Sequence, residues 1–232
     1  MSDALVDGPL EATFAFVDLA GFTALNEAHG DDEAADLVDR FEELTRSSLA
    51  PGDRLVKTIG DAVFVIFDDP GLALGALTRL LTAAVAEPGF LLPRSGLHHG
   101  SAIAWRGDVV GNSVNLAARV AGQAHGGQTL GTAGVAMAAR ASGVHVVDLG
   151  CFDLRNIAES VELYQLDLCP ETAGSTVDPV CRMAVRRADA AGRLRHADMD
   201  HWFCSLACAA RFAADPARFV TNAPDGAAGP NP

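Results

Sequence analysis

The chain has 232 residues, of which 49% are hydrophobic, and its formal net charge is −13 at pH 7. A chain of this length and composition can bury one good core and still carry a small appendage. The whole acidic excess lies in residues 1–170, which argues against a nucleic-acid partner.

The sequence predicts neither a signal peptide nor a membrane span. The N-terminal residues lack a basic region followed by an apolar one, and the most apolar stretch, residues 71–86, is short and interrupted by Arg79. We therefore expect a cytoplasmic protein with no membrane partner. Cysteines stay reduced in that compartment, so clustered cysteines would indicate a metal site before a disulfide.

Strands and helices alternate along the first 168 residues. The hydrophobic pattern predicts strands over residues 12–17, 54–58, 62–67, 95–105, 144–149 and 161–168, and helices over 31–49, 72–86 and 114–121. A further helix follows the first strand, with Thr23 as its predicted N-cap. This order predicts an α/β (α+β) fold, a ferredoxin-like sandwich with extra elements appended.

The composition changes after residue 168. Residues 169–177 form a short polar linker, residues 178–221 a compact segment, and residues 222–232 a Pro/Gly/Ala-rich tail that we expect to be disordered. The predicted domain boundaries are therefore 1–168, 169–177, 178–221 and 222–232.

Two aspartates end neighbouring predicted elements, Asp18 after the first strand and Asp61 at the turn of a hairpin. With no cation nearby in sequence, two adjacent carboxylates are costly to bring together without a metal ion. An aspartate after a strand is, however, more often a turn or a helix cap. The pattern alone leaves both interpretations open.

Three segments of the chain match known signature motifs: FVDLAGFT at 16–23, VKTIGDA at 56–62 and GDVVGNSVNLAAR at 107–119. They resemble the motifs of class III adenylyl and guanylyl cyclases and occur in that family's order. The resemblance covers roughly residues 10–168. It implies a homodimeric lyase of signal transduction that converts ATP to 3′,5′-cyclic AMP and pyrophosphate, with its sites at the dimer interface.

The resemblance also implies which residues act on the phosphates. Asp18 and Asp61 match the ligands of two Mg²⁺ or Mn²⁺ ions per active site, which neutralise the triphosphate and activate the ribose 3′-hydroxyl. Asn115 and Arg119 match the pair that supports the transition state. Four residues apart on a helix, these two side chains share one face.

Lys57 and Asp108 match the family's adenine-reading pair. Lysine is an obligate donor and aspartate an obligate acceptor, so they fit N1 and the N6 amino group of adenine and mismatch guanine. Lys57 is also the only lysine beside 16 arginines, which suggests a position that needs a compact ammonium group.

Two other functions stay open for the main domain. One is a metal-responsive interaction protein that binds nucleotide without turnover, and the other is guanylyl cyclase activity. The arm between Gly100 and Asp108 is short, as in bacterial members, which leaves the dimer contacts undefined.

Three of the cysteines, Cys181, Cys204 and Cys208, have the spacing C-x22-C-x3-C. Cysteines at i and i+4 share a helix face and can aim two thiolates at one ion. With Asp178-Pro179 and Phe212 they resemble the YHS/TRASH family of small metal-binding modules, which implies a Zn²⁺ or Cu⁺ site able to regulate the cyclase.

The fourth ligand of this cysteine site is not fixed by the sequence. His196, His201 and Asp178 are candidates, and a three-coordinate site is an alternative. Arg182 stands where the family usually has glycine. The histidines at 29, 98, 99 and 125 have no partners at metal spacing, so we interpret them as solvent or loop residues.

Overall fold

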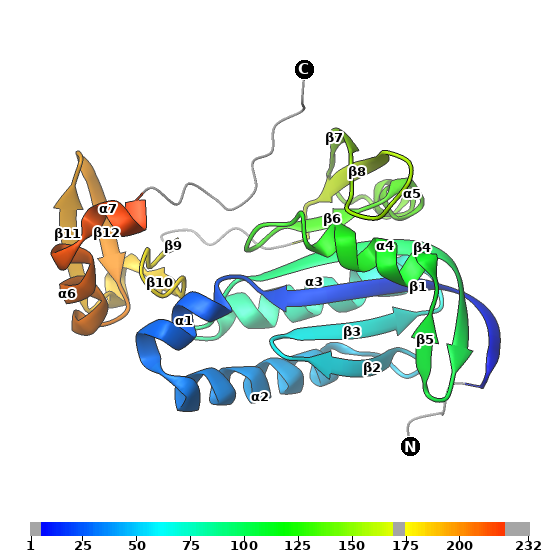
Figure 1. Cartoon of the computed structure of the whole chain (residues 1–232), viewed down its shortest axis with the longest axis horizontal. Helices are drawn as coiled ribbons and strands as arrows, with labels where there is room; N and C mark the ends of the chain where they lie inside the picture. The colour runs from blue at the N-terminus through cyan, green and yellow to red at the C-terminus, as the bar shows by residue number, and fades with distance from the viewer. Residues whose placement is uncertain (1–5, 169–174, 221–232) are drawn as a thin grey trace.

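The computed structural model describes residues 6–168 and 175–220 (Figure 1). Over these residues the chain forms one large sheet with helices packed on it and a smaller C-terminal segment of short hairpins and two helices. Residues 169–174 of the predicted linker and the predicted tail 222–232 lie outside the described residues.

The large sheet is mixed, in the order β2-β3-β1-β4-β6-β8-β7, with β5 paired to β4. All neighbouring strands are antiparallel except β4 and β6, which are parallel. Its strands are β1 (Gly8–Leu19), β2 (Arg54–Ile59), β3 (Ala62–Phe67), β4 (Pro93–Trp105), β5 (Asp108–Val110), β6 (Thr129–Gly131), β7 (Val146–Phe152) and β8 (Val161–Leu166).

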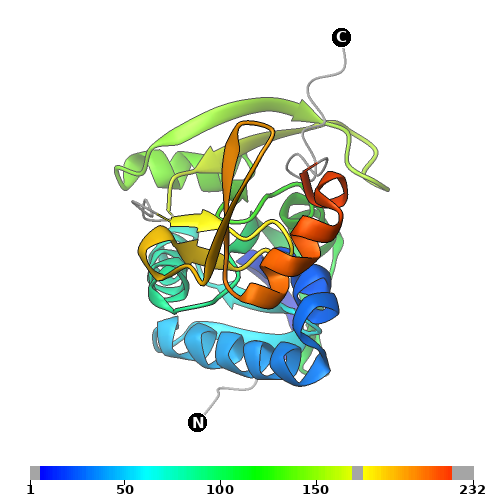
Figure 2. The same cartoon turned by 90° about the vertical axis from the view of Figure 1, so that its left-hand side faces the viewer.

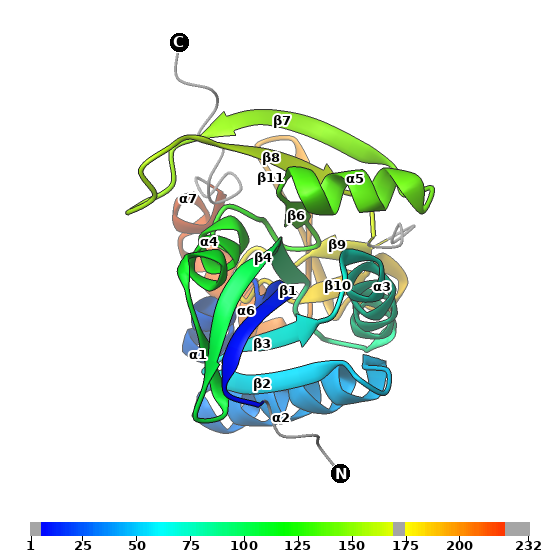
Figure 3. The same cartoon turned by 90° about the vertical axis from the view of Figure 1, so that its right-hand side faces the viewer.

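Helices cover both faces of this sheet (Figure 3). They are α1 (Phe22–His29), α2 (Asp31–Ser48), α3 (Pro70–Ala86), α4 (Asn112–Ala121) and α5 (Ala133–Ala141). The larger core joins α2, α3 and α5 to Ala15 and Val17 of β1, whereas α4 packs on the opposite face with Phe14. Because side chains alternate along a strand, Asp18 belongs to the α4 face.

The predicted α/β sandwich is confirmed, and each strand and helix predicted within residues 1–168 is present, with shifted ends except at β3. The pattern missed β5, β6 and α5. Strands of three residues are too short to show a period of two, and the alanine-rich α5 lacks a contrasting polar face.

The predicted cap of α1 is wrong. The helix begins at Phe22 behind Gly21, whose φ is 88°, and Thr23 lies inside the first turn. A left-handed backbone at this position favours glycine over a side-chain cap. By contrast, α3 has the expected kind of cap, since the Asp69 carboxylate accepts a hydrogen bond from the backbone N of Gly71 at 2.7 Å.

The C-terminal segment comprises β9 (Ser175–Val177), β10 (Ala184–Arg186), the 3-10 turn η1 (Arg187–Asp189), β11 (Gly192–His196), β12 (Met199–Phe203), α6 (Leu206–Ala214) and α7 (Pro216–Val220). It lies against α1 and the loop before β4 (Figure 2). The last three residues of the predicted linker are therefore not linker, because they form β9 and pair with β10.

The segment shares its core with the main domain. Met183 bridges to Leu91, and the backbone N of Ala184 donates to the carbonyl of Phe90 at 3.0 Å. Phe203 and Phe212 belong to the same buried cluster as the helices of the main domain. None of the helices within residues 6–168 and 175–220 has the length and apolar character needed to cross a membrane.

Candidate functional site

Asp18 and Asp61 are brought together by the pairing of β1 with β3. Asp18 lies opposite Ala62, and the backbone N of Leu19 donates to the carbonyl of Asp61 at 3.2 Å. Burial and the negative charge of Asp18, whose carboxyl group is within hydrogen-bonding reach, raise the pKa of Asp61 to about 6. Two carboxylates in mutual contact form an oxygen donor set of the type that hard divalent cations prefer.

No cation is near these carboxylates in sequence, but the fold brings one to Asp18. Arg94 lies opposite Asp18 in the β1–β4 pairing, and its Nε and Nη2 donate to Oδ2 of Asp18 at 2.7 and 2.5 Å. Arg94 and Asp61 line the same cleft of about 490 Å³. The sequence alone did not find Arg94 because it lies 76 residues from Asp18 and meets it only through strand pairing.

Lys57 and Asp108 form an ion pair, with Nζ of Lys57 donating to Oδ2 of Asp108 at 2.5 Å. The register of β2 shifts between Leu55 and Lys57, so Lys57 lies opposite Phe64. Without this bulge Lys57 would point to the opposite, buried face. The hydrogen bonds from Lys57 and from the backbone N of Val109 lower the pKa of Asp108.

Asn115 and Arg119 are exposed on α4, one turn apart. Asn115 lines a second cleft, of about 410 Å³, together with Lys57, Asp108 and Phe16. Arg119 forms no salt bridge with any residue that the structure describes.

Four of the six predicted site residues line two separate clefts. The cleft that holds Asp61 and Arg94 and the cleft that holds Lys57, Asp108 and Asn115 share no lining residue. Within one chain, Asp61 and the predicted base-reading pair therefore line different cavities.

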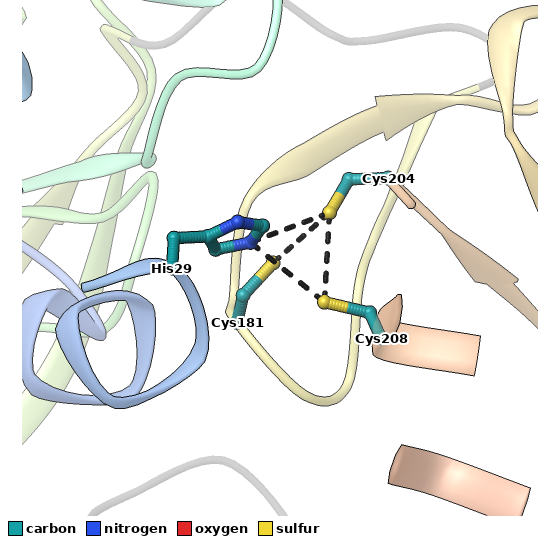
Figure 4. A group of neighbouring side chains, drawn as sticks. All are labelled: His29, Cys181, Cys204 and Cys208. Atoms are coloured by element: carbon teal, nitrogen blue, oxygen red, sulfur yellow. Dashed lines mark hydrogen bonds between the residues drawn. The ribbon is translucent and has the colours of Figure 1, made fainter. Parts of the chain in front are cut away.

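The three cysteines do meet at one point, and the fourth member of the cluster is His29 (Figure 4). Sγ of Cys204 lies 3.4 Å from Sγ of Cys181 and 3.7 Å from Sγ of Cys208. Nε2 of His29 lies 3.7 Å from Sγ of Cys204 and 3.7 Å from Sγ of Cys208. Hydrogen bonds from Cys181 and Cys204 lower the pKa of Cys208.

All three predicted candidates for the fourth ligand lie outside this cluster. The carboxylate of Asp178 accepts hydrogen bonds from the backbone N of Val180 and Cys204, each at 2.8 Å. The rings of His196 and His201 pack against Phe212, with centroids 6.0 and 4.8 Å away.

Interpreting His29 as a solvent residue is also wrong, since it closes the cysteine cluster from α1. No spacing rule could have found it, because it precedes Cys204 by 175 residues. The same interpretation is wrong for His98 and His99, which lie half-buried in β4. Their Nδ1 atoms contact the hydroxyls of Thr132 and Thr13 at 2.8 and 2.9 Å.

The fold matches solved structures of nucleotide cyclases. Two adenylate cyclases of Trypanosoma brucei in their monomeric state superpose with a TM-score of 0.63 each, at 24% and 25% identity, covering 69% and 73% of this chain and 89% and 95% of theirs. The chain has the fold of a nucleotide cyclase catalytic domain. The adenylyl cyclase CyaB of P. aeruginosa shares this cyclase fold, with a TM-score of 0.58 over 70% of this chain and 96% of its own.

Sequence relatives point in the same direction. A pH-sensitive adenylate cyclase of Mycobacterium tuberculosis is 37% identical over 123 residues, which are 53% of this chain and 31% of that protein. An adenylate cyclase of Streptomyces griseus is 38% identical over 106 residues, 45% of this chain and 27% of its own. The chain spans about a third of the length of these curated relatives.

No protein-family model matches the chain. The likeness of the C-terminal segment to YHS/TRASH modules therefore stays a prediction.

Proposed function

We propose that this protein is an adenylyl cyclase that converts ATP to 3′,5′-cyclic AMP and pyrophosphate at the interface of a homodimer. The observation that carries the proposal is the division of candidate residues between two separate clefts of one chain, with Asp61 lining one and Lys57, Asp108 and Asn115 lining the other. A head-to-tail dimer brings the carboxylate cleft of one protomer to the base-reading cleft of its partner, which makes two equivalent sites.

Asp18 and Asp61 would hold the divalent ions, Mg²⁺ or Mn²⁺. Asp61 lines a cleft, and burial together with the negative charge of the neighbouring Asp18 raises its pKa. When bound, such ions neutralise the polyphosphate and lower the pKa of the ribose 3′-hydroxyl. Arg94 lines the same cleft and supplies a further cationic group for the phosphate oxygens.

Lys57 and Asp108 would read the base. They are already paired, at 2.5 Å, so the donor and the acceptor are held side by side for the N1 and N6 edge of adenine. Guanine presents the opposite pattern at these two positions, and this mismatch favours ATP over GTP.

Asn115 and Arg119 would act on the ribose and the α-phosphate. Asn115 lines the same cleft as Lys57. Arg119 lies on the next turn of α4 and forms no ion pair with a carboxylate among the described residues. A guanidinium placed in this way stabilises charge that develops on phosphoryl oxygens.

The surface around the β4–β5 hairpin supports dimer formation. Ile103, Trp105 and Val110 are 53%, 52% and 47% exposed there, next to the cleft of Lys57 and Asp108. Such an exposed group of large apolar side chains is typical of an interaction surface.

The test is to incubate the purified full chain with ATP or with GTP, each with Mg²⁺ or Mn²⁺, and to quantify both cyclic nucleotides. We expect cyclic AMP to exceed cyclic GMP. Asp61→Ala should abolish turnover, whereas Asp167→Ala, which changes an exposed aspartate at the far end of the sheet, should not. Tight ATP binding without any cyclic product would favour a nucleotide-binding interaction protein, and an excess of cyclic GMP would favour a guanylyl cyclase.

A further inference from the structure

The cluster of His29 with Cys181, Cys204 and Cys208 joins the two parts of the chain. The four ligand atoms lie within 4.8 Å of one another. Four of the six separations are 3.4 to 3.7 Å, which fits a tetrahedral zinc site, because metal–ligand bonds of about 2.3 Å to sulfur and about 2.0 Å to nitrogen place neighbouring ligand atoms about 3.5–3.8 Å apart. The closest sulfur pair is far longer than a disulfide bond of about 2.05 Å.

Local structure holds each cysteine in place. Both oxygens of the buried Asp178 accept backbone hydrogen bonds, one from Val180 and one from Cys204, which fixes the turn around Cys181. Ser205 caps α6 by accepting from the backbone N of Cys208 at 3.1 Å. The thiols are therefore positioned by groups that do not themselves bind the ion.

His29 is held in place by contacts within α1 and by a contact from α6 of the C-terminal segment. His29 is the last residue of α1, immediately before Gly30, whose backbone N donates to the carbonyl of Asn26 at 2.8 Å. One turn of helix away from the cysteines, Nη1 of Arg211 in α6 donates to the carbonyl of Glu27 at 2.9 Å. Helices α1 and α6 thus meet where the four ligand atoms converge.

We infer that these four residues bind one Zn²⁺ ion, and that this ion fastens the C-terminal segment to α1 of the main domain. Three thiolates and one imidazole in a tetrahedral arrangement form a closed donor set of the kind found in structural zinc sites. A closed site leaves no coordination position for a substrate. Its role is therefore to hold two parts of the structure together.

The cysteine–histidine site lies where Zn²⁺ binding can affect the cleft that contains Asp61. Helix α1 runs from Gly21, on the wall of the cleft that contains Asp61, to His29 at the cysteine cluster. Arg182, the residue after Cys181, lines that same cleft. Zn²⁺ binding therefore fixes both α1 and the turn around Cys181, and each of these extends from the cysteine cluster to the cleft of Asp61.

The test uses the full chain, stripped of metal and reduced, without nucleotide. Zn²⁺ is titrated against a chromophoric chelator, and Co²⁺ serves as a spectroscopic probe because a tetrahedral thiolate site gives intense visible and sulfur-to-metal charge-transfer bands. We expect one Zn²⁺ per chain. His29→Ala should weaken Zn²⁺ binding by ~10²-fold or more and alter the Co²⁺ spectrum, while His29→Cys should restore binding and strengthen the charge-transfer band.

His145→Ala and Cys151→Ser are the matched controls, since both residues are exposed and lie outside the cluster. Neither should change binding. Amide exchange should show that Zn²⁺ protects both residues 175–220 and the end of α1. An unaltered affinity and Co²⁺ spectrum in His29→Ala would overturn the four-ligand site, and binding that protects the C-terminal segment alone would overturn the link to α1. Since the readouts need no ATP, they stand apart from the proposed cyclase activity.

Discussion

The side chain of Arg182 packs directly on the backbone of Gly21. A methyl group added at Gly21 would overlap Cβ and Cγ of Arg182. Both residues have a left-handed backbone, with φ of 88° at Gly21 and 68° at Arg182. Arg182 thus has a backbone conformation that normally favours glycine, and its side chain lines the cleft of Asp61.

Gly21→Ala should lower the free energy of unfolding by about 1–3 kcal/mol, because the new methyl group meets Arg182 and the backbone conformation disfavours alanine. Adding Arg182→Gly should recover part of this loss, because it removes the overlapping side chain. Denaturant unfolding of the two single variants and the double variant measures the coupling.

The control for this cycle is Gly134→Ala in α5, where nothing lies within 4 Å of the added carbon. This change should be neutral or slightly stabilising. If the two changes lower the free energy of unfolding additively in the double variant, the side chain of Arg182 is not the cause of the loss in Gly21→Ala.

Lys57→Glu should change base choice without unfolding the protein. The Lys57–Asp108 pair is 42% and 41% exposed, so its loss should alter stability by no more than about 1 kcal/mol. ATP turnover should collapse, and the preference for ATP over GTP in kcat/KM should fall by ~10²-fold or more. An unchanged ratio of the two kcat/KM values would mean that Lys57 does not read the purine.

Mixing Asp61→Ala with Arg119→Ala tests the shared site. Each variant alone should be nearly inactive. In a statistical mixture half of the dimers are mixed and each holds one intact site, so activity should return to about one quarter of the wild-type value. Activity should return only when the two variants exchange subunits. The formation of mixed dimers can be followed with differently tagged chains that are separated by size. If both variants dimerise with each other and the mixture stays inactive, the two half-sites act within one chain.

Mg²⁺ binding at the carboxylate pair should depend on pH. The pKa of Asp61 is raised to about 6, so this group is protonated in the metal-free fold below pH 6 and ionised above it. Its ionisation disfavours the metal-free fold as pH rises between the unfolded and folded pKa values, and Mg²⁺ removes this penalty.

The Mg²⁺-dependent increase in Tm should therefore be large at pH 7.5 and small at pH 5, where the apparent affinity is about tenfold lower because a proton competes with the ion. Asp61→Asn should remove both the increase and its pH dependence. The thiolate and imidazole cluster prefers softer ions, so it should contribute little to a Mg²⁺ titration. An equal Mg²⁺ effect at both pH values would argue against ion binding by Asp61.

Local sequence patterns were enough for most of the main domain. The run of β-branched and aromatic residues at 62–67 and the first-turn acids of α2 predicted elements that the structure contains. The C-x22-C-x3-C spacing correctly grouped Cys181, Cys204 and Cys208. These features are readable because side-chain periodicity and helix-face spacing depend only on neighbours along the chain.

The tertiary structure decided which distant residues complete each site. Arg94 reaches Asp18 because β4 pairs with β1, and Lys57 reaches Asp108 because a bulge in β2 turns it to the α4 face. His29 joins the cysteines because the C-terminal segment packs on α1. Strand pairing, register and docking bring together residues 51 to 179 positions apart, and no local pattern records such contacts.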